Sequence, residues 1–255
     1  MCKLLLSGIL YCYLIMSMLK KSGLLFSLPL LIVFFSCTAR IDGTIMEGGA
    51  ADLTIKTSLE PRTIALIRSL RGFMGEAADA PILDGPAISR SMAAAPGVRA
   101  VSLKNTGPSA LEGSISISRV GDFLAAEGAK GRFITYTEAP GPHMRTSIVI
   151  TMDRDSAPAL ISRLSPEMEE YLSALMAPVV LGEKTTRQEY LGLLTMVYGR
   201  SLADEIAAAR IRAVIEFPRP VTVRGGTASG KRVEFDIPLA ELLVLEQPLR
   251  YEVSW

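Results

Sequence analysis

The sequence of 255 residues predicts an α+β fold in which mainly antiparallel β-hairpins pack against a helical cluster. Three observations support this fold class. Short segments that alternate apolar and polar residues, as half-buried strands do, come in pairs around turns that contain Gly or Pro. Helical patterns concentrate in one block, residues 156–210. Strand–helix–strand units do not repeat along the chain, which argues against a parallel sheet.

The N-terminal segment has the pattern of an export signal. Lys20 and Lys21 form a basic region, twelve apolar-rich residues follow at 24–35, and a small residue stands before Cys37. Twelve residues are too few to cross a bilayer, which takes about 20. We therefore predict a signal peptide at residues 1–36 and one exported α+β domain at residues 37–255.

A second apolar run, residues 4–18, precedes the basic region. The two runs together are also compatible with a membrane hairpin, which is the alternative to an export signal. Translation that begins at Met18 would remove the first run and leave the signal intact. The order of a basic region and then a short apolar run favours the signal peptide.

The chain has three cysteines, Cys2, Cys12 and Cys37, and none follows Cys37. The exported part therefore cannot form a disulfide within itself or a cysteine-based metal site, and it depends on its own core. A cysteine that directly follows an apolar signal is better explained by lipid modification than by packing.

The residues "VFFSC" at 33–37 resemble the lipobox of bacterial lipoproteins, in which an apolar stretch ends in a small residue before cysteine. The resemblance implies that Cys37 becomes the first mature residue and carries a diacylglycerol thioether and an N-acyl chain, with fatty acids such as palmitate. The body of the chain also resembles uncharacterised bacterial envelope lipoproteins, which open with an alternating hairpin and close with a segment like residues 238–255. Thr38 is not the Asp that commonly retains lipoproteins at the inner membrane, so delivery to the outer membrane is compatible with the sequence.

The elements of the exported part follow from local patterns. A helix is expected from Pro61 to Gly72 and a short one at 86–95. Thr186 and Glu189 form a capping box, and Ser201 is positioned to cap the next helix. The expected strands are 39–46, 51–59, 98–105, 111–118, 131–139, 143–153, 212–217, 221–226, 231–238 and 250–255, with a short helix at 239–245.

Residues 224–235, "RGGTASGKRVEF", nearly match the sequence pattern of the phosphate-binding loop of nucleotide-hydrolysing enzymes. Such a loop requires a helix that begins at the Lys and a Ser or Thr after it to hold magnesium. Arg232 occupies that place, and the following residues alternate as a strand does. We therefore expect residues 221–226 and 231–238 to form a hairpin around "TASG", with Arg224 or Lys231 near acidic residues of the facing strand, and no nucleotide to bind.

Other candidate sites have stronger structural explanations. His143 is the only histidine, and it stands in a turn, so a serine hydrolase triad or a His-based metal site is disfavoured. Asp153 and Asp155 could bind a cation, but Asp155 or Ser156 more plausibly caps a helix. Glu167, Glu169 and Glu170 are expected in the first turn of a helix, where the helix dipole stabilises acidic side chains. Their clustering is thus explained by helix stability and not by a functional site.

An apolar helical face suggests the main alternative function. It comprises Met168, Tyr171, Leu172, Leu175 and Met176. This face and the segment 190–199 could close a cavity over the sheet and carry a hydrophobic ligand or lipid, although a core helix explains the pattern as well.

Composition excludes a nucleic-acid binder. Without residues 1–36 the chain carries 24 basic against 26 acidic side chains, and it has no concentrated Lys/Arg stripe. The sequence therefore predicts a membrane-anchored envelope protein, not an enzyme, that has a binding or structural role and no cofactor. A hydrophobic-ligand carrier is the first alternative and a serine-type hydrolase the second.

Overall fold

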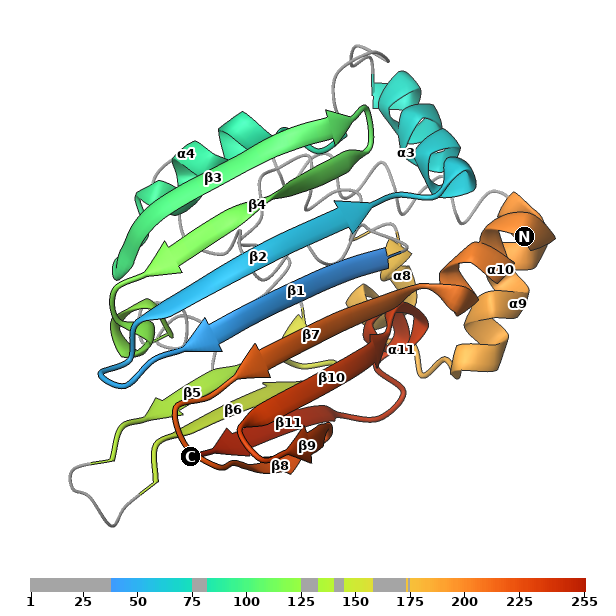
Figure 1. Cartoon of the computed structure of the whole chain (residues 1–255). Coiled ribbons are helices and arrows are strands. Elements are labelled where there is room, and N and C mark those ends of the chain that lie inside the picture. The colour runs from blue at the N-terminus through green and yellow to red at the C-terminus, as the bar shows by residue number, and fades with distance from the viewer. Residues whose placement is uncertain (1–37, 75–81, 125–132, 140–144, 158–172, 174) are drawn as a thin grey trace, which may run out of the picture.

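The structure, a computed structural model, describes residues 38–74, 82–124, 133–139, 145–157, 173 and 175–255. It contains two sheets and several helices (Figure 1). The first sheet has seven strands in the order β3-β4-β2-β1-β7-β10-β9, and the second has four in the order β5-β6-β11-β8. The α+β class with mainly antiparallel strands is confirmed, since every described strand pair except β1–β7 is antiparallel.

The strand bounds agree with the expected segments except at β9, whose residues were expected to form a turn. The seven-stranded sheet comprises β3 (Val98–Gly107), β4 (Ala110–Ile117), β2 (Ala51–Ser58), β1 (Thr38–Ile45), β7 (Arg210–Glu216), β10 (Arg232–Pro238) and β9 (Thr227–Ser229). The four-stranded sheet comprises β5 (Ile134–Thr137), β6 (Ser147–Met152), β11 (Leu249–Ser254) and β8 (Thr222–Arg224). The helices are α3 (Pro61–Met74), α4 (Gly85–Ala93), α8 (Ala177–Val180), α9 (Arg187–Tyr198), α10 (Arg200–Ala208) and α11 (Leu239–Val244).

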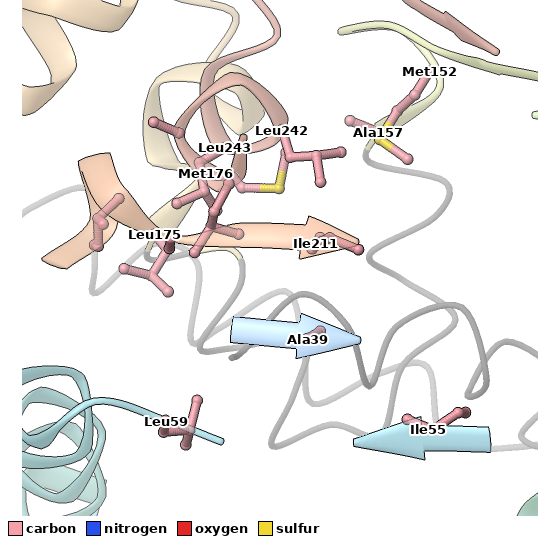
Figure 2. Close-up of a cluster of buried hydrophobic side chains, with 14 of the residues drawn as sticks. Ala39, Ile55, Leu59, Met152, Ala157, Leu175, Met176, Ile211, Leu242 and Leu243 are labelled. Atoms are coloured by element: carbon pink, nitrogen blue, oxygen red, sulfur yellow. The ribbon is translucent and has the colours of Figure 1, made fainter. Parts of the chain in front are cut away.

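One face of the seven-stranded sheet forms the wall of the core. Ala39 of β1, Ile55 of β2 and Ile211 of β7 are buried on this face, and side chains of α11 and of the segment before α8 belong to the same cluster (Figure 2). Burial of apolar side chains contributes about 25 cal/mol for each Å² removed from water, so this shared layer is the main attachment of the helices to the sheet.

Aromatic contacts join the two sheets. Phe235 of β10 meets Tyr251 of β11 edge to face, with ring centroids 5.6 Å apart. Phe217, directly after β7, contacts Trp255 with centroids 4.9 Å apart. Such pairs add about 0.5–1.5 kcal/mol to the burial of their surfaces, and here they fix the second sheet against the end of the first.

The loop at residues 224–235 has a different arrangement from the predicted one. Residues Arg232–Pro238 form a strand after Gly230-Lys231, as expected. Its hairpin partner, however, is Thr227–Ser229, whereas Thr222–Arg224 pairs with β11 in the other sheet. Gly225, with φ of 81°, and Gly226 allow the chain to pass between the sheets, because a Cβ on either would clash with neighbouring atoms.

The helix ends confirm some predictions and correct others. The capping box of Thr186 and Glu189 at the start of α9 is present. Ser201 does not cap α10; the helix begins at Arg200 and its N-cap residue is Gly199. Gly72 does not end α3, which continues to Met74. Sequence patterns place a helix more reliably than its ends, where the chain can shift by one or two residues.

A carboxylate from a distant helix completes the start of α3. Glu205 of α10 accepts hydrogen bonds from the backbone N–H groups of Arg62 at 3.1 Å and Thr63 at 3.0 Å. These N–H groups have no partner within their own helix. Glu205 therefore caps α3 from outside and fixes the two helices to each other.

Gly113 of β4 lies close to the backbone of β3. An added Cβ would meet the carbonyl oxygen of Ser102 and would lie 2.8 Å from the Cα of Leu103, both in the backbone of β3. We expect Gly113→Ala to lower the free energy of unfolding by about 1–3 kcal/mol, because the strands must move apart. The measurement is urea unfolding of the full chain followed by circular dichroism.

The control is Gly192→Ala in α9, where nothing lies within 4 Å of the added Cβ. This change should raise the free energy of unfolding by up to ~1 kcal/mol, because Ala favours a helix over Gly. Equal effects of the two substitutions would contradict the close approach of β3 and β4.

The cap supplied by Glu205 gives a second prediction. Glu205→Ala should lower the free energy of unfolding by about 1–2 kcal/mol, because it removes the carboxylate that accepts hydrogen bonds from two N–H groups of α3. Its neighbour Asp204 is exposed and only pairs with Arg200 at 3.7 Å, so Asp204→Ala should change stability by less than ~0.5 kcal/mol. The same urea titration measures both, and a larger loss for Asp204→Ala would refute the cap.

Candidate functional site

The two faces of the seven-stranded sheet differ sharply in chemistry. Side chains alternate along β1, so Ala39, Ile41 and Ile45 face the core while Arg40 and Asp42 point to the other side. Within the described residues, no helix lies across this second face, which looks toward the viewer in Figure 1. We call it the open face.

The strand register arranges the side chains of the open face in four rows across the sheet. The first row comprises Thr38, Ser58, Ala110 and Arg210. The second comprises Arg40, Lys56, Glu112, Lys104, Arg212 and Asp236. The third comprises Asp42, Thr54, Ser114, Ser102, Val214 and Glu234. The fourth comprises Thr44, Asp52, Ser116, Ala100, Glu216 and Arg232.

Charge is distributed unevenly over these rows. The first two rows contain five basic and two acidic side chains, and we call them the basic end. The last two contain four acidic side chains and one basic one, and we call them the acidic end. Arg99, in the bulge at the start of β3, adds a second cation near the acidic end, 3.4 Å from Asp52. The open face is therefore polarised along β1, from positive near Thr38 to negative near Thr44.

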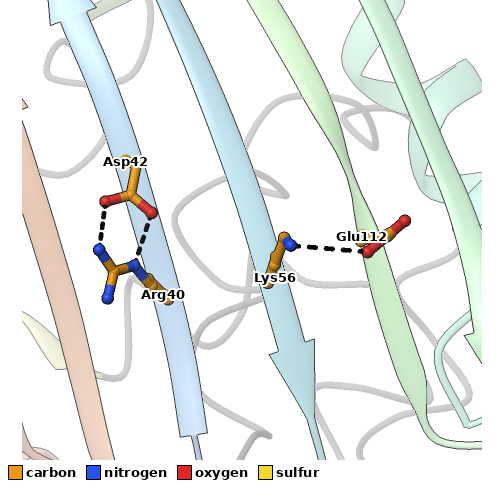
Figure 3. Close-up of polar contacts among 4 residues, drawn as sticks. All are labelled: Arg40, Asp42, Lys56 and Glu112. Carbon is orange, nitrogen blue, oxygen red and sulfur yellow. Dashed lines mark hydrogen bonds and ion pairs between the residues drawn. The ribbon is translucent and has the colours of Figure 1, made fainter.

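Ion pairs join neighbouring charged side chains of the open face (Figure 3). Arg40 donates two hydrogen bonds to the carboxylate of Asp42, at 2.6 and 2.9 Å. This hydrogen bonding, with the nearby positive charge, lowers the pKa of Asp42 and keeps it ionised. Glu112 lies 4.0 Å from Lys56 and 3.2 Å from Lys104, so one carboxylate faces two ammonium groups.

These pairs are exposed and therefore add little to stability. All their members except Glu112 have side chains more than two-fifths exposed. Such groups exchange partners readily, because water screens each pair. The basic end is thus available to an external anion, and Arg210 has no ion-pair partner among the described residues that would compete for it.

The open face is hollowed at both ends. A shallow depression of about 570 Å³ lies at the basic end, over Thr38, Arg40, Lys56 and Arg212. Another of about 470 Å³ lies at the acidic end, over Asp42, Asp52, Glu216 and Arg232. In the part of the chain that the structure describes, no three His, Cys, Asp or Glu side chains are grouped so that they could hold a metal ion.

A second surface feature is apolar. The last two turns of α9 expose Leu193, Met196 and Val197, which share one side of the helix through their i, i+3, i+4 spacing. The exposed fractions of Met196 and Val197 are 76% and 67%. We call these three residues the α9 patch. Large apolar side chains exposed together are characteristic of interaction surfaces.

The α9 patch corrects one expectation about segment 190–199. Tyr190 and Leu194 are buried, as a helix facing the core requires. Met196 and Val197 lie outside, so the second half of this helix does not close a cavity over the sheet. Leu175 and Met176 belong to the packed core, whereas Met168, Tyr171 and Leu172 lie outside the described residues.

Several of the predicted site residues lie outside the residues that the structure describes. Cys37, His143 and the three glutamates at 167, 169 and 170 lie outside the described residues. Asp153 acts as a cap, because its carboxylate accepts from the backbone N–H of Ser156 at 2.8 Å. The helix that Asp155 or Ser156 was predicted to cap would extend into residues outside the described ranges, so this cap stays a prediction. No helix of the described ranges is long and apolar enough to span a bilayer.

Sequence reasoning missed both the polarised open face and the α9 patch. The alternation of residues 39–46 and 51–59 indicates that one side of each strand is polar. The rows, however, depend on how six strands are aligned with one another, which alternation does not specify. The signal for the α9 patch was the run Met196, Val197 and Tyr198, which has too many apolar residues for one narrow helical stripe.

No family model matches the chain, and no curated protein matches it. Among solved structures, the chain is similar to the NMR structure of the folded domain of LppM from Mycobacterium tuberculosis. The sequence identity is 10% and the TM-score is 0.38, and the alignment covers 92% of this chain and 93% of that one. The function is therefore inferred from the residues and their geometry.

Proposed function

We propose that the chain is a lipid-anchored protein of the bacterial cell envelope, held through Cys37, with a non-enzymatic binding or structural role. One observation carries the proposal. An apolar run preceded by Lys20-Lys21 ends in Ser36-Cys37, and Thr38, which belongs to the central strand of the larger sheet, is the next residue of the chain. A folded strand is thus joined through few residues to the cysteine that a lipobox would modify.

The chemistry of Cys37 fits a permanent anchor. Each methylene group of an acyl chain that enters the bilayer contributes about 0.8 kcal/mol, and one chain alone gives only marginal binding. A diacylglycerol thioether together with an N-acyl chain exceeds that threshold. The later sequence contains no cysteine with which Cys37 could form a disulfide.

Three of the shifted pKa values of described residues have purely structural causes. Hydrogen bonds from Ser156 lower the pKa of Asp153, and hydrogen bonds from Thr186 lower that of Glu189. Burial raises the pKa of Tyr190. The first two groups cap a turn or a helix and the third packs in the core, so none of these three shifts marks a catalytic group.

The open face supports a binding or structural role. It presents hydroxyl, carboxylate and cationic side chains on a rigid sheet, without a deep pocket beneath the two depressions that described residues line. Such a surface suits contact with another polar surface better than the enclosure of a small molecule.

The anchor is tested by metabolic labelling with a fatty acid in a bacterial host. The parent chain should incorporate label and Cys37→Ala should not, because the thiol is the attachment point. Cys12→Ala is the matched control and should keep the label, since Cys12 lies in the part removed with the signal. Mass spectrometry of the purified parent should show that residues 1–36 are absent and that Cys37 has gained acyl groups.

The anchor is refuted if Cys37→Ala incorporates as much label as the parent. It is equally refuted if the purified parent retains residues 1–36 with an unmodified thiol at Cys37. Either result would favour the membrane hairpin formed by the two apolar runs.

A further inference from the structure

The α9 patch lies at the same end of the domain as the start of β1. Helix α9 passes through Gly199 into α10, and α10 leads through Ala209 to Arg210, which pairs with Thr38. Figure 1 shows α9 and α10 beyond the end of the sheet at which β1 begins. The helix that carries the patch therefore lies at the end of the described domain to which Cys37 is joined.

The basic end of the open face lies at this same end. Arg210 is in the row of Thr38, and Arg40, Lys56 and Arg212 are in the next row. A β-strand advances about 3.3 Å per residue, so the second row is about 7 Å from the first. Three features thus coincide: the point of attachment, a set of cations and an exposed apolar helix face.

We propose that this end of the domain docks on the bilayer, with the α9 patch entering the interfacial layer and the basic end facing anionic lipid headgroups. The proposal rests on the lipid anchor at Cys37. We identify the bilayer as the contacted surface because Thr38 directly follows the anchored residue. Consecutive Cα atoms are about 3.8 Å apart, so Thr38 lies within that distance of the residue that carries the acyl chains. An anchored bilayer would thus lie next to the basic end, at the end of the sheet beyond which α9 lies.

The residue types match the two layers of a membrane surface. Leu193, Met196 and Val197 are uncharged and apolar, as residues that enter the boundary between headgroups and acyl chains are. Arg and Lys favour phosphate groups, and guanidinium can bind them with two parallel hydrogen bonds. Lys56 and the arginines also have long apolar stems that can lie along the interface while their charges reach the headgroups.

The test places a tryptophan on the docking end of the full chain. The protein is purified from bacterial membranes and reconstituted into vesicles of phosphatidylcholine with brominated acyl chains, which quench tryptophan on contact. We expect strong quenching of the fluorescence that Val197→Trp adds, and more when phosphatidylglycerol is included. The parent supplies the baseline, because Trp255 is the only tryptophan in the chain.

The matched control is Met46→Trp, in the turn after β1. Met46 is exposed and lies with Trp255 around one depression, at the opposite end of β1 from Thr38. Brominated lipid should leave Trp255 and the tryptophan introduced at position 46 unquenched. Equal quenching at positions 46 and 197 would overturn the orientation.

The charges are tested separately. The triple variant Arg40→Gln, Lys56→Gln, Arg212→Gln, combined with Val197→Trp, should lose the extra quenching that phosphatidylglycerol causes. Each removed charge should lower the ratio of docked to undocked protein about fivefold. Arg232→Gln at the acidic end is the control and should leave that ratio unchanged. An unaltered response of the triple variant would overturn the role of the basic end.

Mass spectrometry of the same preparation shows whether Cys37 is acylated. This result distinguishes failure of the lipid anchor from failure of bilayer docking. Quenching at position 197 with an unmodified Cys37 supports docking and refutes the anchor. No quenching with an acylated Cys37 refutes docking and leaves the anchor standing. If position 197 is shielded from soluble acrylamide but not quenched by lipid, a protein covers the α9 patch, and bilayer docking is overturned.

Discussion

The alternation of side chains along β1 is the constraint on which the rest of the structure depends. β1 occupies the middle of the seven-stranded sheet, antiparallel to β2 and parallel to β7. A shift of the register by one residue would place Arg40 in the core and Ala39 in water, so burial of one face fixes the register. The same register aligns the charges of the open face in rows. Core packing and surface charge are therefore consequences of one pattern of eight residues.

Contacts from side chains to distant backbone groups fix the helices relative to β1. Arg154 donates to the carbonyl groups of Leu245, Glu183 and Thr185, which ties the end of α11 to the segment before α9. Glu246 accepts from the first N–H of α9 at 2.9 Å, so this helix is held at its start. Because α9 is held at one end and packs on α10, the α9 patch keeps its position relative to the sheet.

Local patterns predicted most of the strands and several helix starts. They did not predict which strands pair when the strands are far apart in the sequence. The first hairpin and the capping box at Thr186 depend on neighbouring residues alone, and both are present. The transfer of β8 to the second sheet was missed, because alternation does not specify which strand is the neighbour. The parallel pairing of β1 with β7 joins segments about 170 residues apart. This pairing depends on how the whole core packs and not on the residues of either strand alone. The polarised open face depends on that pairing, so it could not be read from the sequence.

For the anchored arrangement proposed above, the polarity of the open face matters more than the net charge of the domain. Without residues 1–36 the chain has a small excess of acidic groups, which by itself opposes binding to an anionic bilayer. Screening limits such repulsion to about 8 Å at physiological ionic strength. Along β1 the row of Arg40 lies about 7 Å from Thr38, the row of Asp42 about 13 Å and the row of Thr44 about 20 Å. A membrane held next to Thr38 by the proposed anchor at Cys37 would therefore meet the row of Arg40 within one screening length and the rows of Asp42 and Thr44 beyond it. The proposed attachment point would thus make an acidic domain locally attractive to anionic lipid.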